Sequence, residues 1–396
     1  MQTRIKTLLT ATSALSLLLT LGIGQHYLQN SVTAASNSRM VPHFEVNPFW
    51  PQPLPNEWIL GMTIGVAVDA RDHIYIVHRN NVGFAPQELG LDNGIASCCT
   101  GAPPILEFDI DGKLLNAWGG PGEGYTWPES NHGLEIAPNG NIWIGGNGGA
   151  DSHMLVFTAS GDFVRQIGIP GEPVDSNSTT HFNKVAEIAI DAVANEAYIA
   201  DGYGNKRVAV VDVATGAFKR YWGAYGNVPS DDRVVYTPGE PLPQQFAGPV
   251  HCAEPSNDGL IYVCDRGADR IQVFRPDGTF VKEGQIAPMT VGAGATWDIA
   301  FSQDDDQEFL YVADGSNMNV HIVDRESLEE LYVIGQGGRQ AGLFYGTHSI
   351  VTDSEGNFYT TETYEGKRVQ KFVYQGLRPL SQLRSGPAWP ADALLD

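Results

Sequence analysis

Three histidines recur at one position of an internal repeat, in alternate copies. They are His132 in NHGLEIAPNGNIWIGG, His251 in PVHCAEPSNDGLIYVCD and His348 in GTHSIVTDSEGNFYTTE. Each histidine opens a short apolar segment, which a Gly-containing turn separates from a second apolar segment. Three neutral imidazoles that converge on one point form an open Zn²⁺ site, with the fourth position left for water or substrate. The spacing therefore predicts a zinc site, provided that the fold arranges the repeats around one axis.

The repeat occurs in six copies, and each copy contains alternating apolar runs split by Asp-Gly, Asn-Gly or Glu-Gly turns. Such turns are typical of β-hairpins. Each copy holds about four strands, which is the content of one propeller blade. The fold is therefore predicted to be all-β, a six-bladed β-propeller with the three histidines about 120° apart around its channel. At the first position of the inner strand, the copies carry in order Ile64, His132, Ala186, His251, Trp297 and His348.

The last copy lacks a fourth strand, because QKFVYQG is followed by a Pro-containing tail. Residues 57–61 (EWILG) resemble the segments KRYWG and LYVIG that end other copies. We expect this N-terminal strand, around Trp58, to pair with the strand around Lys371 and close the ring, which removes exposed sheet edges. The expected organisation is an N-terminal extension at 35–56, the propeller at 57–376 and a C-terminal tail at 377–396.

The first 34 residues resemble a targeting segment. Arg4 and Lys6 precede an uncharged, Leu-rich core, and Val32-Thr33-Ala34 resembles a small-residue cleavage site. Residues 1–34 are therefore predicted to be a signal peptide, or an N-terminal anchor if they are not removed. The protein is expected to be exported to a periplasmic or extracellular location, and to contact a membrane only if this segment is kept.

The charge balance limits the class of partner. The formal net charge is −22, and phosphate backbones are bound by basic surfaces. Nucleic acid is therefore excluded, and the expected partner is a small-molecule or peptide substrate. A single propeller accounts for the whole chain after the targeting segment, and we expect a monomer.

Four cysteines permit disulfides in an exported chain. Cys252 and Cys264 flank a turn almost symmetrically, so they would be cross-strand neighbours that can bond at a non-hydrogen-bonded pair. Cys98 and Cys99 are adjacent, and a vicinal disulfide, metal binding and free thiols all remain open for them. None of the four is expected to be catalytic, and Cys252 should point away from the channel.

Three further side chains follow the second strand of their copies, where the loops open at one rim of the channel. They are Arg79 in copy one, Tyr203 in copy three and Arg266 in copy four. Two guanidinium ions would stabilise the phenolate form of Tyr203, which would make it a general base. An arginine is also the natural partner of a substrate carboxylate. The structural alternatives are a tyrosine packed on the rim and arginines paired with acids such as Asp265.

These segments together resemble the lyase domain of peptidylglycine α-amidating enzymes, a six-bladed propeller of NHL-type repeats. The segment HGL at 132–134, PVH at 249–251 before CDRGADRIQVF, and His348 are similar to its zinc-ligand segments. ADGYGNKR at 200–207 and IVHRN at 76–80 resemble the segments with its active-site tyrosine and one arginine. The resemblance covers residues 57–374, although the linkers and an insertion at 81–103 differ. It implies a zinc-dependent lyase that cleaves a peptidyl-α-hydroxyglycine to a peptide amide and glyoxylate.

The resemblance also implies a structural Ca²⁺ in the channel, held by backbone carbonyls and by an acid after the third histidine. Here Val66 and Leu134 occupy the carbonyl positions, and Ser349 occupies the position of the acid. A hydroxyl binds Ca²⁺ less well than a carboxylate does. Glu187 and Asp298 offer carboxylates at the same register of copies three and five, so calcium binding stays open.

Two other classes of function remain. One is a non-catalytic NHL propeller that binds a protein or glycan on its rim, with any metal only pinning the channel. The other is a different propeller hydrolase, such as a lactonase. Lactonase channels usually hold Ca²⁺ with Glu, Asn and Asp, so a channel dominated by histidines argues against that class.

Overall fold

The structure is a computed structural model that describes residues 39–390, and these residues form two units. The smaller unit comprises residues 39–43 and 376–384, and the larger comprises residues 44–375 and 385–390. In the smaller unit, the backbone N–H of Leu380 donates to the carbonyl of Arg39 at 2.8 Å. The expected signal peptide at 1–34 lies outside the described residues. Within 39–390, no helix has the length and apolar character needed to cross a membrane.

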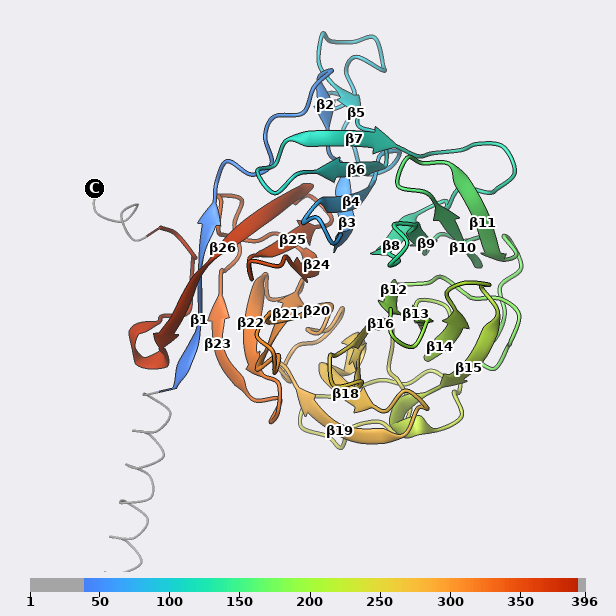
Figure 1. Cartoon of the computed structure of the whole chain (residues 1–396), viewed down its shortest axis with the longest axis vertical. Coiled ribbons are helices and arrows are strands. Elements are labelled where there is room, and N and C mark those ends of the chain that lie inside the picture. The colour runs from blue at the N-terminus through green and yellow to red at the C-terminus, as the bar shows by residue number, and fades with distance from the viewer. Residues whose placement is uncertain (1–38, 391–396) are drawn as a thin grey trace, which may run out of the picture. The chain divides into compact units, whose positions relative to one another are not determined.

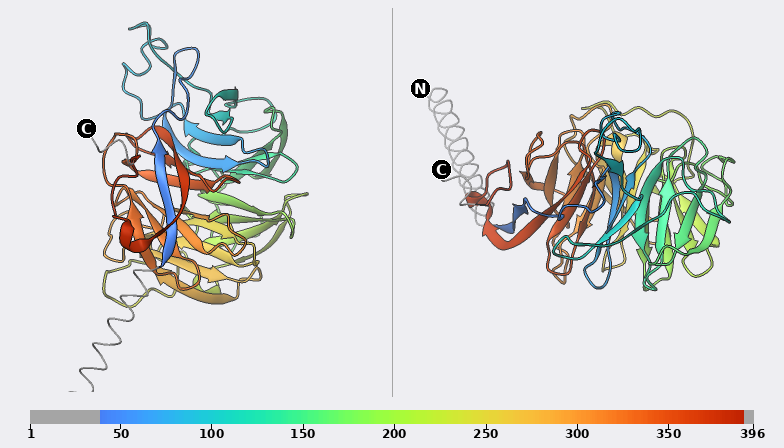
Figure 2. Two further views of the ribbon diagram at one scale, coloured as in Figure 1. Left: turned by 60° about the vertical axis from the view of Figure 1, so that its left-hand side comes forward. Right: turned by 90° about the horizontal axis from the view of Figure 1, so that it is seen from above.

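The larger unit is a six-bladed β-propeller, as predicted (Figure 1). Its blades are four-stranded antiparallel sheets, and the inner strands β3, β8, β12, β16, β20 and β24 neighbour one another around the centre. Figure 2 shows the same blades from two further sides. Blades one to three consist of β3 (Met62–Val68), β4 (Ile74–Arg79), β6 (Ile105–Phe108), β7 (Leu114–Trp118), β8 (Asn131–Ile136), β9 (Ile142–Gly146), β10 (His153–Phe157), β11 (Phe163–Gly168), β12 (Glu187–Asp191), β13 (Glu196–Asp201), β14 (Arg207–Asp212) and β15 (Phe218–Trp222). Blades four to six consist of β16 (Val250–Pro255), β17 (Ile261–Asp265), β18 (Arg270–Phe274), β19 (Phe280–Gln285), β20 (Asp298–Phe301), β21 (Phe309–Asp314), β22 (Asn319–Asp324), β23 (Glu330–Ile334), β24 (Thr347–Thr352), β25 (Phe358–Glu362), β26 (Arg368–Pro379) and β1 (Met40–Asn47).

The closing strand is not the one that we predicted. Blade six has the order β1-β26-β25-β24, so an N-terminal strand does close the ring, but it is β1 and not the segment at 57–61. Phe44 in β1 is buried, and its ring packs edge-on against Phe358 at 4.6 Å. Trp58 instead begins the two-residue strand β2 (Trp58–Ile59), which pairs in parallel with β5 (Thr100–Gly101). The propeller therefore starts within the stretch expected to be an extension.

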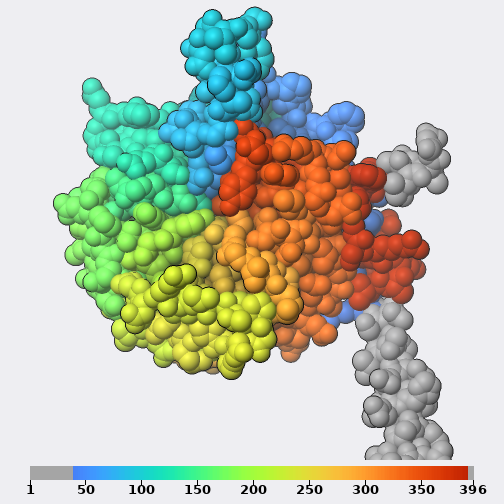
Figure 3. Space-filling view, turned by 180° about the vertical axis from the view of Figure 1, so that it is seen from behind, coloured from blue at the N-terminus to red at the C-terminus, as the bar shows by residue number. Residues whose placement is uncertain are grey.

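A long insertion between β4 and β6 projects from blade one, and its space-filling surface stands out in cyan in Figure 3. It carries the Cys98–Cys99 pair, which forms a vicinal disulfide. The second pair, Cys252–Cys264, is bonded across β16 and β17, where the two residues lie opposite each other. The turn symmetry predicted that these two cysteines would be cross-strand neighbours, and they lie opposite each other as expected. Three 3₁₀ turns complete the described elements: η1 (Ala224–Gly226), η2 (Arg266–Ala268) and η3 (Leu380–Gln382).

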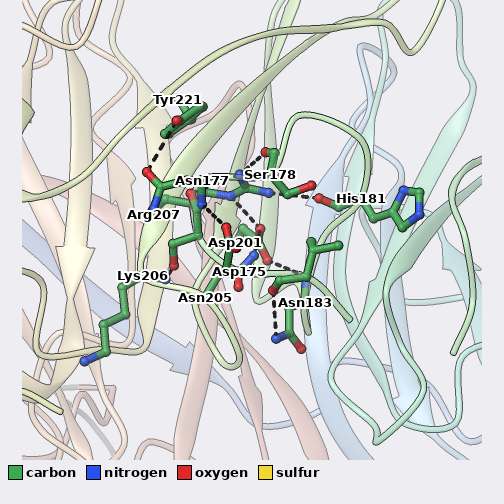
Figure 4. A network of polar contacts seen from close by, with 12 residues as sticks. Asp175, Asn177, Ser178, His181, Asn183, Asp201, Asn205, Lys206, Arg207 and Tyr221 are labelled. Atoms are coloured by element: carbon green, nitrogen blue, oxygen red, sulfur yellow. Dashed lines mark hydrogen bonds and ion pairs between the residues drawn. The ribbon is translucent and has the colours of Figure 1, made fainter. Parts of the chain in front are cut away.

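A buried ion pair at the same place in several blades fixes the loop that leads into the inner strand. An acid ends the second strand, and an arginine begins the third, as in Asp201 and Arg207 of blade three (Figure 4). Asp201 Oδ2 accepts from Arg207 Nε at 2.8 Å, and Oδ1 accepts from the backbone N–H of Asn183 at 2.9 Å. The pairs Asp265–Arg270 and Glu362–Arg368 repeat this arrangement. Each pair therefore positions the segment from which a channel-facing residue emerges.

Replacing Arg207 with methionine is expected to destabilise the propeller by about 3–5 kcal/mol, because it leaves a buried, unpaired carboxylate. Neither side chain of the pair is exposed. The free energy of unfolding in urea measures the effect. Asp258→Asn serves as the control, since it breaks a pair with Arg325 whose carboxylate side is half exposed and should cost less than about 1 kcal/mol. Equal losses in the two variants would contradict this role.

His321 is expected to make the stability of blade five depend on pH. Burial lowers its pKa, but hydrogen bonds to Asp314 and Glu330 outweigh burial and raise the pKa to about 9. Because this value lies above the unfolded value of about 6.5, the protonated ring stabilises the fold fully below pH 6.5. That contribution, about 3 kcal/mol at 1.36 kcal/mol per pKa unit, disappears as the pH rises through 9. Thermal unfolding midpoints should therefore fall between pH 6.5 and 9.5, and His321→Gln should flatten that fall.

Candidate metal centre

The three repeat histidines meet in the channel. Each is the second residue of its inner strand: His132 of β8, His251 of β16 and His348 of β24. Pairing with the second strand shifts register at each histidine, and such bulges re-aim a side chain. The ring centroids lie 4.7–5.3 Å apart, and one nitrogen from each ring lies within 4.8 Å of the others. The fold therefore brings together the cluster that the register predicted.

Backbone carbonyls from the intervening blades fix the tautomer of all three rings. The Nδ1–H of His132 donates to the carbonyl of Ala186 at 2.5 Å. The Nδ1–H of His348 donates to the carbonyl of Ile64 at 2.6 Å, and that of His251 donates to the carbonyl of Trp297. These carbonyls belong to the same register position of the blades that carry no histidine. With Nδ1 protonated, each Nε2 presents a lone pair to the centre, which is the arrangement that metal-binding histidines use.

A glycine makes the first of these contacts feasible. Gly133 follows His132 and adopts a φ of +42°, in the left-handed region that favours glycine. A Cβ at this position would lie 2.9 Å from the carbonyl oxygen of Ala186. Gly133 therefore allows the strand to approach the acceptor of the His132 hydrogen bond.

The histidines are neutral near pH 7. Burial lowers the pKa of His348 to about 3, and the charges of Arg79 and Arg266 add to this effect. Burial also holds the pKa values of His132 and His251 well below their usual range, and neighbouring histidines and arginines add to it. Neutral imidazole is the form that binds a metal ion. The donor set therefore suits a divalent metal with an affinity for nitrogen, such as Zn²⁺.

The hydroxyl of Tyr203 reaches the histidine cluster. Its oxygen lies 3.1 Å from His132 Nε2 and 3.0 Å from His251 Nε2. Arg266 Nη1 donates to the same oxygen at 3.1 Å. Gly202 precedes the tyrosine, and a Cβ there would lie 1.9 Å from the carbonyl oxygen of Val250. The loop after β13 can therefore pass close enough to β16 to place the phenol between two of the imidazole Nε2 atoms.

Arg79 approaches from blade one. Its Nη2 donates to Asn147 Oδ1 at 2.9 Å, and its Nε donates to the carbonyl of Asn131 at 3.3 Å. Burial lowers the pKa of Arg79, whereas Tyr203 and Tyr364 act in the opposite direction. No hydrogen bond joins Arg79 to Tyr203, so the phenol has one guanidinium donor and one more distant charged neighbour.

Neither candidate arginine is neutralised by an acid. Asp265, the acid considered for pairing with Arg266, bonds to Arg270 instead. In residues 39–390, no ion pair involves Arg79 or Arg266, and the Nε of Arg266 has no hydrogen-bond partner although it is buried. Buried charges are usually paired. The unpaired, buried guanidinium of Arg266 and the partly buried one of Arg79 therefore favour an anionic ligand beside the histidines.

The residues expected to hold calcium are arranged differently. Ser349 Oγ donates to the carbonyl of Ile64 at 2.6 Å. Glu187 and Asp298 hydrogen-bond to each other. Burial raises the pKa of Asp298 to about 6. Burial and the charge of Asp298 raise the pKa of Glu187 well above its usual range. The two carboxyls therefore hold one proton between them near pH 7. Ser349 lacks the carboxylate that a calcium site built on Val66 and Leu134 would use, and calcium binding stays an untested prediction.

Two other groups of potential ligand residues are explained by bonding within the protein. Asp69, His73 and Glu107 lie together on blade one, but the guanidinium of Arg71 bonds to both acids. The group that includes Cys252 loses that ligand, because its sulfur is in a disulfide. The histidine cluster is therefore the strongest metal candidate in the described part of the chain.

Sequence reasoning missed Trp297 and Tyr364. The repeat pattern assigns Trp297 only a register position, yet its ring lies under the guanidinium of Arg266 at 4.3 Å and beside His348 at 5.5 Å. Its Nε1–H donates to the carbonyl of Gly294 at 2.8 Å, which fixes the indole. Tyr364 follows the second strand of blade six by two residues, as Tyr203 follows that of blade three, and this spacing was the available signal.

Comparison with known proteins supports the resemblance. No family model matches the chain. It is 26% identical over 301 residues to NHL repeat-containing protein 3 of Mus musculus, covering 74% of this chain and 70% of that protein. It is 26% identical over 247 residues to peptidyl-glycine alpha-amidating monooxygenase B of Xenopus laevis, covering 61% of this chain and 26% of that protein. A probable peptidyl-alpha-hydroxyglycine alpha-amidating lyase of Caenorhabditis elegans is 25% identical over 224 residues, covering 54% of this chain and 56% of that protein.

The chain thus spans about a quarter of the frog protein's length. A solved structure of a protein of unknown function from Bacteroides thetaiotaomicron has a TM-score of 0.52 at 14% identity, covering 85% of this chain and 77% of that chain. At this identity the likeness concerns the fold alone. The expected resemblance is confirmed at that level: the chain is a propeller similar to NHL-repeat proteins and amidating lyases, with a buried cluster of three histidines that could bind a metal.

Proposed function

We propose that this protein is a zinc-dependent carbon–nitrogen lyase that cleaves an acyl- or peptidyl-α-hydroxyglycine to an amide and glyoxylate. The observation that carries the proposal is the position of the Tyr203 hydroxyl, between two unprotonated histidine nitrogens and under Arg266. The site thus combines a proton acceptor, three neutral imidazoles that can bind a metal, and two unpaired guanidinium groups that can bind a carboxylate. The named relatives that are amidating enzymes support the same reaction class.

His132, His251 and His348 would hold the metal through Nε2. When bound, such a metal supplies Lewis acidity that eases the loss of a proton from a substrate hydroxyl. Asn131 and Asn147 hold Arg79, leaving Nη1 with only a weak contact to the Met62 sulfur at 3.9 Å. Arg79 is therefore free to bind the substrate carboxylate and orient its α-carbon.

Tyr203 moves the proton. Its oxygen, which accepts a hydrogen bond from Arg266, removes the hydroxyl proton of the carbinolamide. The O–H electrons form the aldehyde C=O bond, the C–N bond breaks, and the departing nitrogen takes a proton from the phenol. The products are the amide and glyoxylate, and Tyr203 returns to its starting state, so the proton count balances.

The test is direct. Purified, zinc-loaded protein is incubated with N-benzoyl-α-hydroxyglycine, and benzamide and glyoxylate are quantified by chromatography against a protein-free blank. We expect equimolar release of both products. No release above the blank, from this or from a peptidyl substrate, would reject the lyase.

The second candidate is a non-catalytic propeller that binds a ligand on its rim. It is favoured by the similarity to NHL repeat-containing protein 3, whose name states repeats and no activity. It predicts metal binding without glyoxylate release, so the same assay separates the two candidates.

We propose that the protein is exported to a periplasmic or extracellular location. The two disulfides, Cys98–Cys99 and Cys252–Cys264, are bonds that persist in oxidising compartments. Secretion of the full chain from its native cells, followed by N-terminal sequencing of the mature protein, tests both export and removal of residues 1–34.

A further inference from the structure

A second rim tyrosine stands opposite the first. Tyr364 lies two residues after the second strand of blade six, and Tyr203 lies two residues after that of blade three. In a ring of six blades these positions face each other across the channel. The hydroxyl of Tyr203 contacts His132, His251 and Arg266. Tyr364, in contrast, makes no hydrogen bond within residues 39–390 and is 53% exposed. The repeat therefore places an uncommitted aromatic ring at the mouth of the site.

Aromatic contacts connect this ring to the metal ligands. Tyr364 meets Trp297 edge-on at 6.3 Å between ring centroids, and Trp297 meets His348 edge-on at 5.5 Å. Trp297 is only 2% exposed, and it is fixed by Gly294 below and by Arg266 on its face. The indole therefore supports Tyr364, and the accessible aromatic surface is that of Tyr364.

The geometry of the proposed reaction determines which part of the substrate lies beside Trp297 and Tyr364. The substrate hydroxyl is at the histidine cluster, and its carboxylate is at an arginine. The acyl group on the nitrogen must then leave toward the mouth, one aromatic layer beyond the histidines. The face of Trp297 packs against the guanidinium of Arg266 at 4.3 Å, so this aromatic layer adjoins the cationic rim that would hold the carboxylate.

We propose that Trp297 and Tyr364 form an aromatic subsite for the acyl group, so that the protein prefers α-hydroxyglycines whose acyl part is aromatic or large and apolar. This inference rests on the proposed function for the orientation of the substrate. Aromatic pairs in edge-to-face or offset geometry contribute about 0.5–1.5 kcal/mol beyond their burial, which corresponds to about 2- to 12-fold in affinity.

The first arm of the test measures binding without chemistry. N-benzoylglycine and N-acetylglycine lack the reactive hydroxyl and share the carboxylate, and their dissociation constants from zinc-loaded protein are measured by calorimetry. We expect the benzoyl compound to bind more tightly. Tyr364→Ala should weaken it by about 3- to 10-fold and leave N-acetylglycine within 2-fold, while Tyr364→Phe keeps the preference. Phe49→Ala, at an 84% exposed aromatic outside the channel, should change neither ligand.

The second arm measures kcat/KM for the two matching α-hydroxyglycines. The benzoyl-to-acetyl ratio should fall by the same factor in Tyr364→Ala, since the loss is in acyl recognition. Equal losses for both ligands, an unchanged ratio, or no binding of N-benzoylglycine to the unaltered protein would overturn the subsite. If N-benzoylglycine binds more tightly than N-acetylglycine and this preference depends on Tyr364, but the protein releases no glyoxylate, the subsite is upheld and the lyase is rejected.

Discussion

Replacing Tyr203 with phenylalanine is expected to lower kcat for glyoxylate release by about 10²–10⁴-fold, the usual contribution of a positioned general base. The substitution removes only the oxygen that contacts His132, His251 and Arg266. The ring and its edge-on packing against His132 at 4.9 Å stay in place. The three histidine nitrogens are untouched, so the zinc content per chain should not change.

The measurement combines initial rates with elemental analysis of the same preparation. Tyr221→Phe is the matched control, because its hydroxyl lies on blade three away from the channel, with only a 3.4 Å contact to Asn177. A Tyr203→Phe protein with full activity would remove the phenol from the mechanism. Loss of zinc in that variant would show that the oxygen helps to hold the metal, and the base would then have to be sought elsewhere.

Replacing His251 with alanine is expected to abolish stoichiometric zinc binding and to lower the rate by at least about 10³-fold, since metal stabilisation of developing charge is worth several kcal/mol. The substitution removes one of the three nitrogens that would bind zinc, and it leaves the carbonyl of Trp297 without its donor. His132→Ala and His348→Ala should behave alike, because each ring has the same carbonyl support.

His73→Asn provides the control for this experiment. His73 belongs to the other cluster of potential ligands that keeps all its members, with Asp69 and Glu107, so a zinc ion bound there would be lost from this variant. We expect one zinc per chain in His73→Asn and none in His251→Ala. The opposite pattern would place the metal on blade one and contradict the channel site.

The histidine cluster could be predicted because, in a propeller, the position of a residue within its repeat determines whether its side chain points toward the central axis. Identical positions of the six repeats point at one axis, so His132, His251 and His348 had to converge if the blades formed at all. The same logic explains Tyr203 and Arg266, which follow second strands and meet at one rim. Cys252 and Cys264 were predictable for a similar reason, since a tight turn determines which residues face each other.

The closing strand could not be found in this way. β1 pairs with β26, more than 300 residues later, and no local pattern encodes the partner of a strand so far away. Residues 57–61 look like a blade-ending strand, but Trp58 has a nearer partner at Thr100. The burial of Phe44 against Phe358 decided the outcome, and an isolated alternating segment carries no sign of it.

Partners of side chains were the least predictable part of the site. The acceptors of the histidine Nδ1–H groups are backbone carbonyls, which any residue supplies, although Ile64, Ala186 and Trp297 stood at the register that provides them. The pairing of Asp265 with Arg270 instead of Arg266 depends on the direction of one guanidinium. That choice leaves Arg266 for Tyr203 and for a ligand, and local sequence does not reveal it.

The proposed lyase requires one metal ion on the three histidines for glyoxylate release, and a zinc titration examines this requirement. Protein freed of metal by a chelator is supplied with increasing Zn²⁺, and the initial rate on N-benzoyl-α-hydroxyglycine is followed at each step. We expect no activity without metal, and a linear return of activity that breaks at one equivalent of zinc per chain. Full activity in the metal-free protein, or stoichiometric zinc binding with no return of activity, would contradict it.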